Sequence, residues 1–286
     1  MLKELIISMR PQQWYKNLIL FVCIIFSQNL LNIPMWSIVL SAFIIFCMIS
    51  GASYIINDIL DIEKDRIHPK KTKRPIASGS LNKNYALISS IILIISSIGW
   101  SYFINTEFFV ITIAFFTLNI AYSVFLKHII LVDVLTISVN FVIRAIAGCL
   151  AINVIISPWL ILCTFLLALF LALGKRRHEL MLLGTDAISH REFFRDYTTS
   201  LLDQMISIST STLIISYALY TFLQDNIYMM ITIPFAIYGL FRYMLLIHAK
   251  NFGGETEMIF KDNGMLISMG LWFMIVILVL YGKDIL

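Results

Sequence analysis

The sequence predicts an all-α, polytopic membrane protein. Of its 286 residues, 59% are hydrophobic and only 13% are charged, whereas soluble domains carry about a quarter charged residues. The hydrophobic residues gather in runs of about 20, the length that a helix needs to span a bilayer. The polar stretches between these runs are short. We therefore expect a single integral membrane domain over residues 1–286.

Nine apolar runs predict nine transmembrane helices. They lie at about 17–35, 38–57, 85–104, 107–125, 132–152, 157–173, 204–223, 228–248 and 264–282. No small-residue cleavage site follows the first run, so we do not expect a removable signal peptide. An odd number of spans places the two termini on opposite sides of the membrane.

Basic residues lie almost entirely on one side of this topology. The loops after the second, fourth, sixth and eighth runs hold nearly all of them, and Lys3, Arg10 and Lys16 precede the first run. Because basic loops remain in the cytoplasm, we expect a multi-pass protein of the cytoplasmic membrane with its N-terminus inside and its C-terminus outside. Lys283 is the one exception to the pattern.

The second run leads into the most charged stretch of the chain, NDILDIEKDRIHPKKTKRPIASG. It contains four acids and six Lys or Arg residues between Asn57 and Gly79. On a helix, Asp58 and Asp65 project about 20° apart, and Asp61 lies one turn from each with Asn57 in the same arc. Carboxylate and amide oxygens favour Mg²⁺, which also shares phosphate oxygens.

The bases that follow these acids are suited to the other oxygens of a diphosphate. The alternative is a solvated loop that obeys the positive-inside rule, which explains the bases but not four acids at helical spacing. We therefore predict a metal–diphosphate site. Its predicted metal ligands are Asn57, Asp58, Asp61 and Asp65, and we expect the three aspartates to be catalytic.

The segment NDILDIEKD matches N-D-x-x-D-x-x-x-D and resembles the UbiA superfamily of intramembrane prenyltransferases. Four further segments, RPQQWYKN, YSVFLK with Asp133 after it, NFVIRAIAG and GKRRHEL, resemble the branch that transfers phosphoribose to decaprenyl phosphate. The resemblance extends over essentially the whole chain. It implies a nine-helix bundle around a cavity that opens to the cytoplasm and to lipid.

The chain departs from the superfamily after the sixth predicted span. Members that use prenyl diphosphates carry a second motif there, D-x-x-x-D, whereas this chain has Gly174 to Leu180, GKRRHEL, with the single acid Glu179. One acidic cluster beside extra bases fits one metal and several phosphates. The resemblance therefore implies Mg²⁺-dependent transfer of 5-phosphoribose from phosphoribosyl diphosphate to a polyprenyl phosphate in the bilayer.

The substrate-binding residues that this reaction implies are mostly bases. For the donor phosphates we expect Lys70, Lys71, Lys73 and Arg74. For the remaining phosphates, of donor or lipid, we expect Arg10, Lys16, Lys127, Arg144, Lys175 and Arg176. The predicted set is completed by Arg66, Tyr122, Asp133 and Glu179.

Several of these residues also have structural interpretations. The N-terminal bases suit a segment anchored at the membrane interface, and Tyr122 with Lys127 suits an aromatic belt with a snorkelling lysine. Arg144 falls inside a span on one stripe with Asp133, and an intramembrane Arg faces either a cavity or a partner within the bundle. Lys175 and Glu179 form a helix pair.

Two other functions stay open. One is transfer of a prenyl group from a prenyl diphosphate to an aromatic or lipid acceptor. The other is a lipid-binding or transport protein without chemistry, which broken helices and charges in both halves would favour. No nucleic-acid partner is expected, and the oligomeric state is open. The four cysteines lack metal-ligand spacing and predict neither a zinc site nor a disulfide framework.

Overall fold

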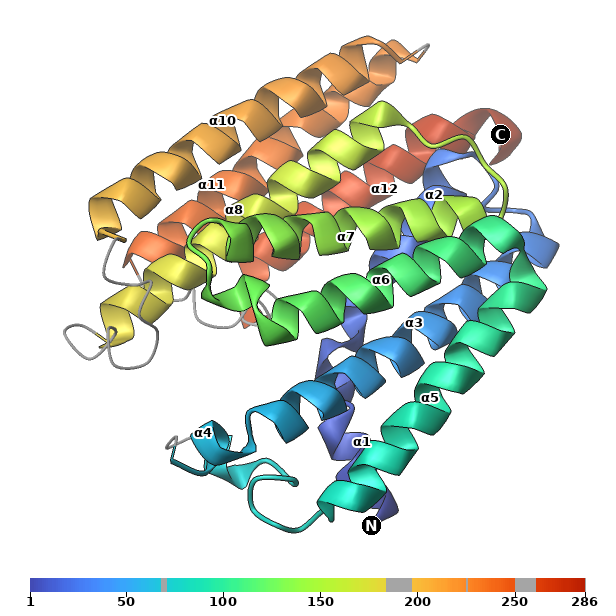
Figure 1. Ribbon diagram of the computed structural model, residues 1–286. Helices are drawn as coiled ribbons and strands as arrows, with labels where there is room; N and C mark the ends of the chain where they lie inside the picture. The colour runs from blue at the N-terminus through green and yellow to red at the C-terminus, as the bar shows by residue number, and fades with distance from the viewer. Residues whose placement is uncertain (68–70, 184–196, 225, 250–260, 286) are drawn as a thin grey trace. The chain divides into compact units, whose positions relative to one another are not determined.

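The computed structural model describes residues 1–67, 71–183, 197–224, 226–249 and 261–285, and all regular structure in these ranges is helical (Figure 1). Eight of the described helices are long and apolar enough to cross a bilayer. The all-α membrane fold is therefore confirmed. The chain divides into two compact units, of which unit 1 is residues 1–127 with 143–156, and unit 2 is residues 128–142 with 157–286.

Unit 1 is built on three long helices, and shorter helical segments precede and follow the first of them. Its elements are α1 (Leu2–Ser8), η1 (Pro11–Phe21), α2 (Val22–Phe26), α3 (Ile33–Leu60), α4 (Ile62–Ile67), η2 (Lys71–Lys73), α5 (Lys83–Ile104), α6 (Thr106–Val124) and the second half of α7 (Val132–Ala151).

Unit 2 contains four long helices and the first half of α7. The short helix η3 (Leu126–His128) leads into it. Its other elements are α8 (Pro158–Leu183), α10 (Thr199–Phe222), η6 (Ile227–Thr232), α11 (Ile233–Ala249) and α12 (Asn263–Ile285).

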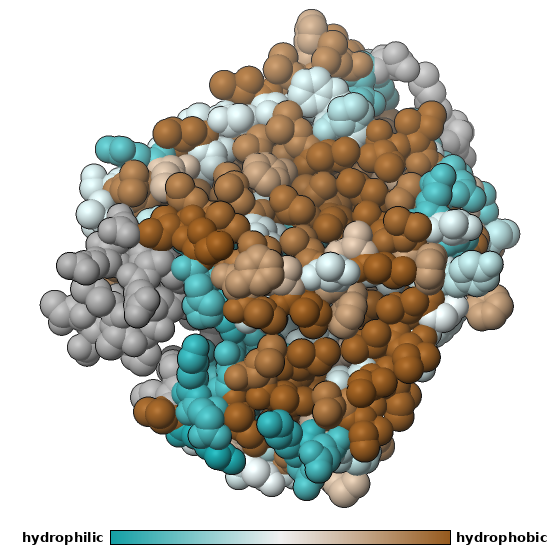
Figure 2. Space-filling model, in the orientation of Figure 1, coloured by the Kyte–Doolittle hydropathy of each residue, from teal (hydrophilic) through white to brown (hydrophobic). Residues whose placement is uncertain are grey.

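The α5 helix shows how unit 1 packs inside a bilayer. Ser90, Ser97 and Ser101 are fully buried, and each hydroxyl donates to a carbonyl of its own helix. Ile92 and Ile95 on other faces are 58% and 67% exposed. Small residues let helices approach closely in lipid. The helix α5 packs against α3 and α6, and its serines are buried while Ile92 and Ile95 are exposed. Figure 2 shows this apolar surface over α5, with hydrophilic colour over α4.

A buried aromatic cluster holds the middle of unit 1. Phe46 of α3 lies 4.7 Å from Phe115 and 5.8 Å from Phe108 of α6, measured between ring centroids. The second half of α7 packs on the same cluster. There η1 approaches so closely that a Cβ on Gly148 would lie 2.3 Å from the carbonyl oxygen of Leu20.

The structure differs from the sequence prediction at the first predicted span. The run 17–35 is not one helix, because η1 ends at Phe21, α2 ends at Phe26 and a turn follows with Gln28 at φ 58°. Asn29 stabilises that turn by donating to the carbonyl oxygen of Ser27. A 3₁₀-helix rises about 2.0 Å per residue, so η1 and α2 in line would still extend about 30 Å, the thickness of the hydrocarbon core.

Unit 2 packs α8 against α10 and α11 against α12. Phe170 of α8 meets Tyr243 of α11 at 5.1 Å between ring centroids. Asp262 accepts from the backbone N–H of Met265 and so caps α12. It also accepts two bonds from Arg242, which joins α11 to the start of α12.

Candidate active site

The predicted metal ligands lie where α3 passes into α4. Asn57 and Asp58 belong to the last turn of α3, Asp61 caps it, and Asp65 belongs to α4. The amide of Asp61 donates to the carbonyl of Asn57 at 2.9 Å, and the amide of Asp65 donates to the carbonyl of Asp61 at 2.8 Å. Because helical bonding continues through the junction, the acids keep the helical spacing that the sequence predicts.

Asp58 and Asp65 share one base. Nη1 of Arg74 donates to Asp58 Oδ1 at 3.0 Å and to Asp65 Oδ2 at 2.6 Å. Both carboxylates are almost completely buried, with side chains 3% and 2% exposed. Lys71 lies 3.9 Å from Asp65 on the outer side. The two acids at the ends of the motif therefore face the same point, as their spacing predicts.

Arg10 is the second base on Asp58. Its Nη2 donates to Asp58 Oδ1 at 2.5 Å, and its guanidinium lies 4.8 Å from the centre of the Tyr54 ring. The backbone of Arg10 is in the left-handed region, at φ 52° and ψ 64°, which is uncommon for a residue with a side chain. Tyr54 was missed from the sequence, although its position one turn before Asp58 on α3 places it on the same face.

Asp61 and Asn57 form a second pair of oxygen ligands around Lys127. Nζ of Lys127 lies 2.8 Å and 3.1 Å from the carboxylate oxygens of Asp61. The same nitrogen lies 3.4 Å from Oδ1 of Asn57. Side chains of Asp61 and Lys127 are 20% and 14% exposed, so this pair is closer to solvent than Asp58 and Asp65.

The side-chain oxygens of Asn57, Asp58, Asp61 and Asp65 form two pairs of possible ligands for a divalent cation. Within the described residues, no three His, Cys, Asp or Glu side chains are arranged to hold a metal ion by themselves. Instead, a positive nitrogen already bridges each pair, Arg74 between Asp58 and Asp65 and Lys127 between Asn57 and Asp61. An all-oxygen set that is completed by water and phosphate is what Mg²⁺ prefers.

Arg66 and Lys16 bond to neighbours on their own helices. Arg66 pairs with Glu63 on the exposed face of α4 at 3.2 Å. Lys16 donates to Gln13 along η1. Lys73 is exposed on η2 and Tyr122 is half-buried on α6, whereas Lys70 lies outside the described residues.

Arg144 is buried in unit 1. Its Nε donates to Oδ1 of Asn17 at 2.8 Å, and its guanidinium lies 4.7 Å from the centre of the Phe115 ring. The amide of Asn17 in turn donates to the sulfur of Cys47. Asn17 is the last residue of the RPQQWYKN segment, and no sequence pattern pairs it with a span more than a hundred residues away. These contacts are of the kind expected for an arginine that faces a partner within the bundle.

Four predicted residues lie in unit 2. Arg176 of α8 is 3% exposed, donates to Asp133 at 2.6 Å and also donates to Glu179. Asp133 is fully buried, and its second oxygen has no hydrogen-bond partner among the described residues. Burial raises the pKa of Tyr197, whose hydroxyl accepts from the amide of Leu131, and the carboxylate of Asp133 adds to the rise. Lys175 is exposed.

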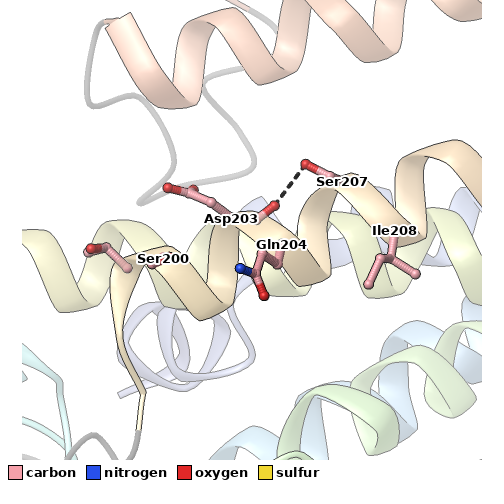
Figure 3. Close-up of a pocket in the computed structure, with 6 residues that line it drawn as sticks. Ser200, Asp203, Gln204, Ser207 and Ile208 are labelled. Carbon is pink, nitrogen blue, oxygen red and sulfur yellow. Dashed lines mark hydrogen bonds between the residues drawn. The ribbon is translucent and has the colours of Figure 1, made fainter.

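A separate hollow lies along the start of α10 (Figure 3). It is lined by Thr199, Ser200, Asp203, Gln204, Ser207 and Ile208. All six belong to one helix, and none is a predicted site residue. Asp203 is bound by Arg177 at 2.5 Å and by His248 at 3.1 Å, so it joins α8, α10 and α11. These ion pairs give Asp203 a structural role, and the cluster of unit 1 is our candidate site.

Comparison with known proteins identifies the family of the chain. The profile of the UbiA prenyltransferase family matches residues 18–261. The chain belongs to the UbiA prenyltransferase family. As a member it is a transferase and a multi-pass membrane protein, as the sequence predicts.

Two curated relatives match nearly the whole chain, and a third matches part of it. Decaprenyl-phosphate phosphoribosyltransferase of Mycolicibacterium smegmatis is 30% identical over 94% of this chain and 89% of its own length. The protein of the same name from Corynebacterium glutamicum is 28% identical over 96% of this chain and 86% of its own. A protoheme IX farnesyltransferase of Leptospira biflexa is 31% identical over 36% of this chain.

Solved structures share the fold. A UbiA homologue of Archaeoglobus fulgidus, solved with GPP and Mg²⁺ bound, has a TM-score of 0.74 and 17% identity over 97% of this chain and 99% of its own. A structure of digeranylgeranylglyceryl phosphate synthase has a TM-score of 0.68 and 20% identity, covering 98% of each chain. These likenesses establish the UbiA fold for this chain.

Proposed function

We propose that the chain transfers 5-phosphoribose from phosphoribosyl diphosphate to a polyprenyl phosphate in the bilayer. The observation that carries the proposal is the alternation of acids and bases at the α3–α4 junction. Asp58, Asp61 and Asp65 are each bound by a base from another segment of unit 1. Acids suit a metal and bases suit phosphate oxygens, so the cluster can take both parts of a metal–diphosphate ligand.

The chemistry is a displacement at C1 of the ribose. The bond from C1 to the diphosphate oxygen breaks, and the diphosphate leaves with the electron pair. A phosphate oxygen of the lipid forms the new bond to C1. A phosphate monoester is already largely ionised near pH 7, so the reaction needs no strong general base.

The bases of the cluster act on the leaving group. Negative charge grows on the diphosphate as the bond breaks, so Arg10, Arg74 and Lys127 would bind the transition state more tightly than the ground state. Mg²⁺ held by Asn57, Asp58, Asp61 and Asp65 would supply further positive charge to the same oxygens. Lys70, Lys71 and Lys73 follow directly in the chain and would extend the phosphate-binding surface outward.

The relatives support the choice of donor. Those that match nearly the whole chain are named for transfer to decaprenyl phosphate, whereas the farnesyltransferase matches only 36% of it. The stretch Gly174 to Leu180 also holds two arginines and one lysine beside a single acid. Both observations favour a donor with several phosphates over a prenyl diphosphate.

The location of the site follows from the loops around it. The α3–α4 junction continues into the most basic loop of the chain, which the positive-inside rule places in the cytoplasm. Phosphoribosyl diphosphate is water-soluble and highly charged, so it would reach the site from that side. The polyprenyl chain would stay among the apolar side chains that α5 and α6 present outward.

The test is transfer by the full chain in membranes. Phosphoribosyl diphosphate labelled in the ribose is incubated with Mg²⁺ and a polyprenyl phosphate. We expect label to enter the organic phase only when the lipid phosphate is present, to stop with EDTA and to resume with excess Mg²⁺. Label that stays in water with lipids of every chain length, while a prenyl diphosphate donates to an aromatic acceptor, would establish the prenyl alternative instead.

A further inference from the structure

We infer that Arg10, Arg74 and Lys127 act as internal counter-ions, so that the site binds a divalent cation and a diphosphate together and rejects either one alone. The inference rests on the proposed function, because it concerns how metal and donor reach the acids of the α3–α4 junction. It assigns to these bases a selective role in addition to phosphate binding.

The charges of the cluster already cancel. Arg10 lies 2.5 Å from Asp58, Arg74 lies 2.6 Å from Asp65, and Lys127 lies 2.8 Å from Asp61. Three carboxylates therefore meet three bases. A fourth base, Lys71, lies 3.9 Å from Asp65 at the edge. Counted over the described residues, the cluster is neutral or slightly positive before any ligand arrives.

Burial makes this balance hard to disturb. With the bases in place, the side chains of Asp58 and Asp65 are 3% and 2% exposed, so each carboxylate depends on a base and not on water for its partner. A cation that arrives alone must either add two charges to a neutral site or displace a base and leave it unpaired. Charges that are buried without partners are costly, so free Mg²⁺ is expected to bind weakly.

A diphosphate that arrives alone meets the converse problem. It attracts the bases, and when Arg74 turns toward it, Asp65 keeps only the contact with Lys71 at 3.9 Å among the described residues. When metal and diphosphate arrive together, the cation takes the carboxylates and the bases take the phosphate oxygens. Every charge then keeps a partner. Coupling of this kind is reciprocal, so each ligand tightens the binding of the other by the same factor.

The fold allows this exchange without moving the acids. The three bases come from three separate segments: Arg10 is the residue before η1, Arg74 is the residue after η2, and Lys127 belongs to the short helix η3. Each is a long side chain that is 14% to 24% exposed. Each can therefore turn from a carboxylate to an incoming phosphate while α3 keeps its place.

The experiment measures Mn²⁺ binding to the purified full chain by electron paramagnetic resonance, with and without inorganic diphosphate. We expect diphosphate to tighten Mn²⁺ binding at least about tenfold in the wild type. Lys127→Met removes one internal counter-ion, so Mn²⁺ alone should bind about tenfold more tightly and the coupling should shrink. Lys64→Met is the matched control, because it removes the same charge from an exposed position on α4. Its Mn²⁺ affinity should stay within about twofold of the wild type.

Three other results would contradict the inference. Wild-type protein that binds Mn²⁺ equally well with and without diphosphate overturns the inference and leaves the proposed function standing. An equal rise in Lys64→Met also overturns it, because the effect would then come from net charge and not from contact. If Lys127→Met does not fold, Arg10→Met carries the same prediction. Absence of Mn²⁺ binding under every condition contradicts both the inference and the proposed function.

Discussion

Nζ of Lys127 lies 2.8 Å from Oδ2 of Asp61, although 66 residues separate the two in the chain. The bond joins the segment after α6 to the end of α3. Together, Lys127, Arg10 and Arg74 surround the acids with bases from three separate segments. A local motif supplies the acids of the candidate site, and the tertiary fold supplies their partners.

Arg74 holds two buried carboxylates, so its loss should destabilise unit 1. Among the described residues, Arg74→Met leaves Asp58 with Arg10 and leaves Asp65 with Lys71 at 3.9 Å. We expect the free energy of unfolding to fall by about 2–4 kcal/mol, since breaking a buried pair strands a charge. Unfolding by SDS in mixed micelles measures it. Arg66→Met is the control, because Arg66 pairs with an acid that is 80% exposed, and it should change stability by less than about 0.5 kcal/mol. Equal stability of the two variants would contradict the geometry of Arg74.

Gly148 allows η1 to contact α7. Gly148→Ala would place a Cβ 2.3 Å from the carbonyl oxygen of Leu20, and the backbone on both sides would have to move. We expect a loss of about 1–3 kcal/mol in the same unfolding measurement. Gly99→Ala on α5 meets no atom within 4 Å and should be neutral or slightly stabilising, because alanine favours a helix. If both variants are equally stable, η1 does not lie against α7 as described.

The bond between Asn17 and Arg144 can be tested as a pair. Asn17→Ala and Arg144→Met each remove one side of a buried hydrogen bond of 2.8 Å. In a double-mutant cycle we expect the two losses of stability to fall short of additivity by about 1–2 kcal/mol. Additive losses would mean that the two side chains do not interact. That result would favour the other interpretation of the sequence, in which Arg144 faces a cavity.

The acids of the candidate site were predictable because they lie on one helix end, where spacing alone fixes direction. Asp58 and Asp65 meet the same nitrogen of Arg74, as a separation of about 20° requires. Three predicted bases, Arg10, Arg74 and Lys127, also reach the acids. Their family motifs indicated phosphate binding, but nothing in the sequence showed which acid each would contact.

Long-range partners were not predictable from one sequence. Tyr54 under Arg10 and Asn17 beside Arg144 depend on how separate segments pack. Arg176 was expected to bind phosphate, and the structure places it between Asp133 and Glu179. The first predicted span included the polar residues 27–29. In the structure α2 ends just before them, and a side-chain bond from Asn29 to the backbone stabilises the turn. Hydropathy averaged over a window of about 20 residues hides so short an interruption.

The most direct test of the candidate site compares two neighbouring acids in the phosphoribosyl transfer assay. Asp61→Asn removes a carboxylate that faces Lys127, and Glu63→Gln removes one that is 80% exposed and faces only Arg66 among the contacts of the described residues. Both variants should fold in membranes. We predict that Asp61→Asn lowers the rate of transfer at least about a hundredfold and that Glu63→Gln stays within about twofold of the wild type. Transfer by folded Asp61→Asn at the wild-type rate would contradict the assignment of these acids to the metal–diphosphate site.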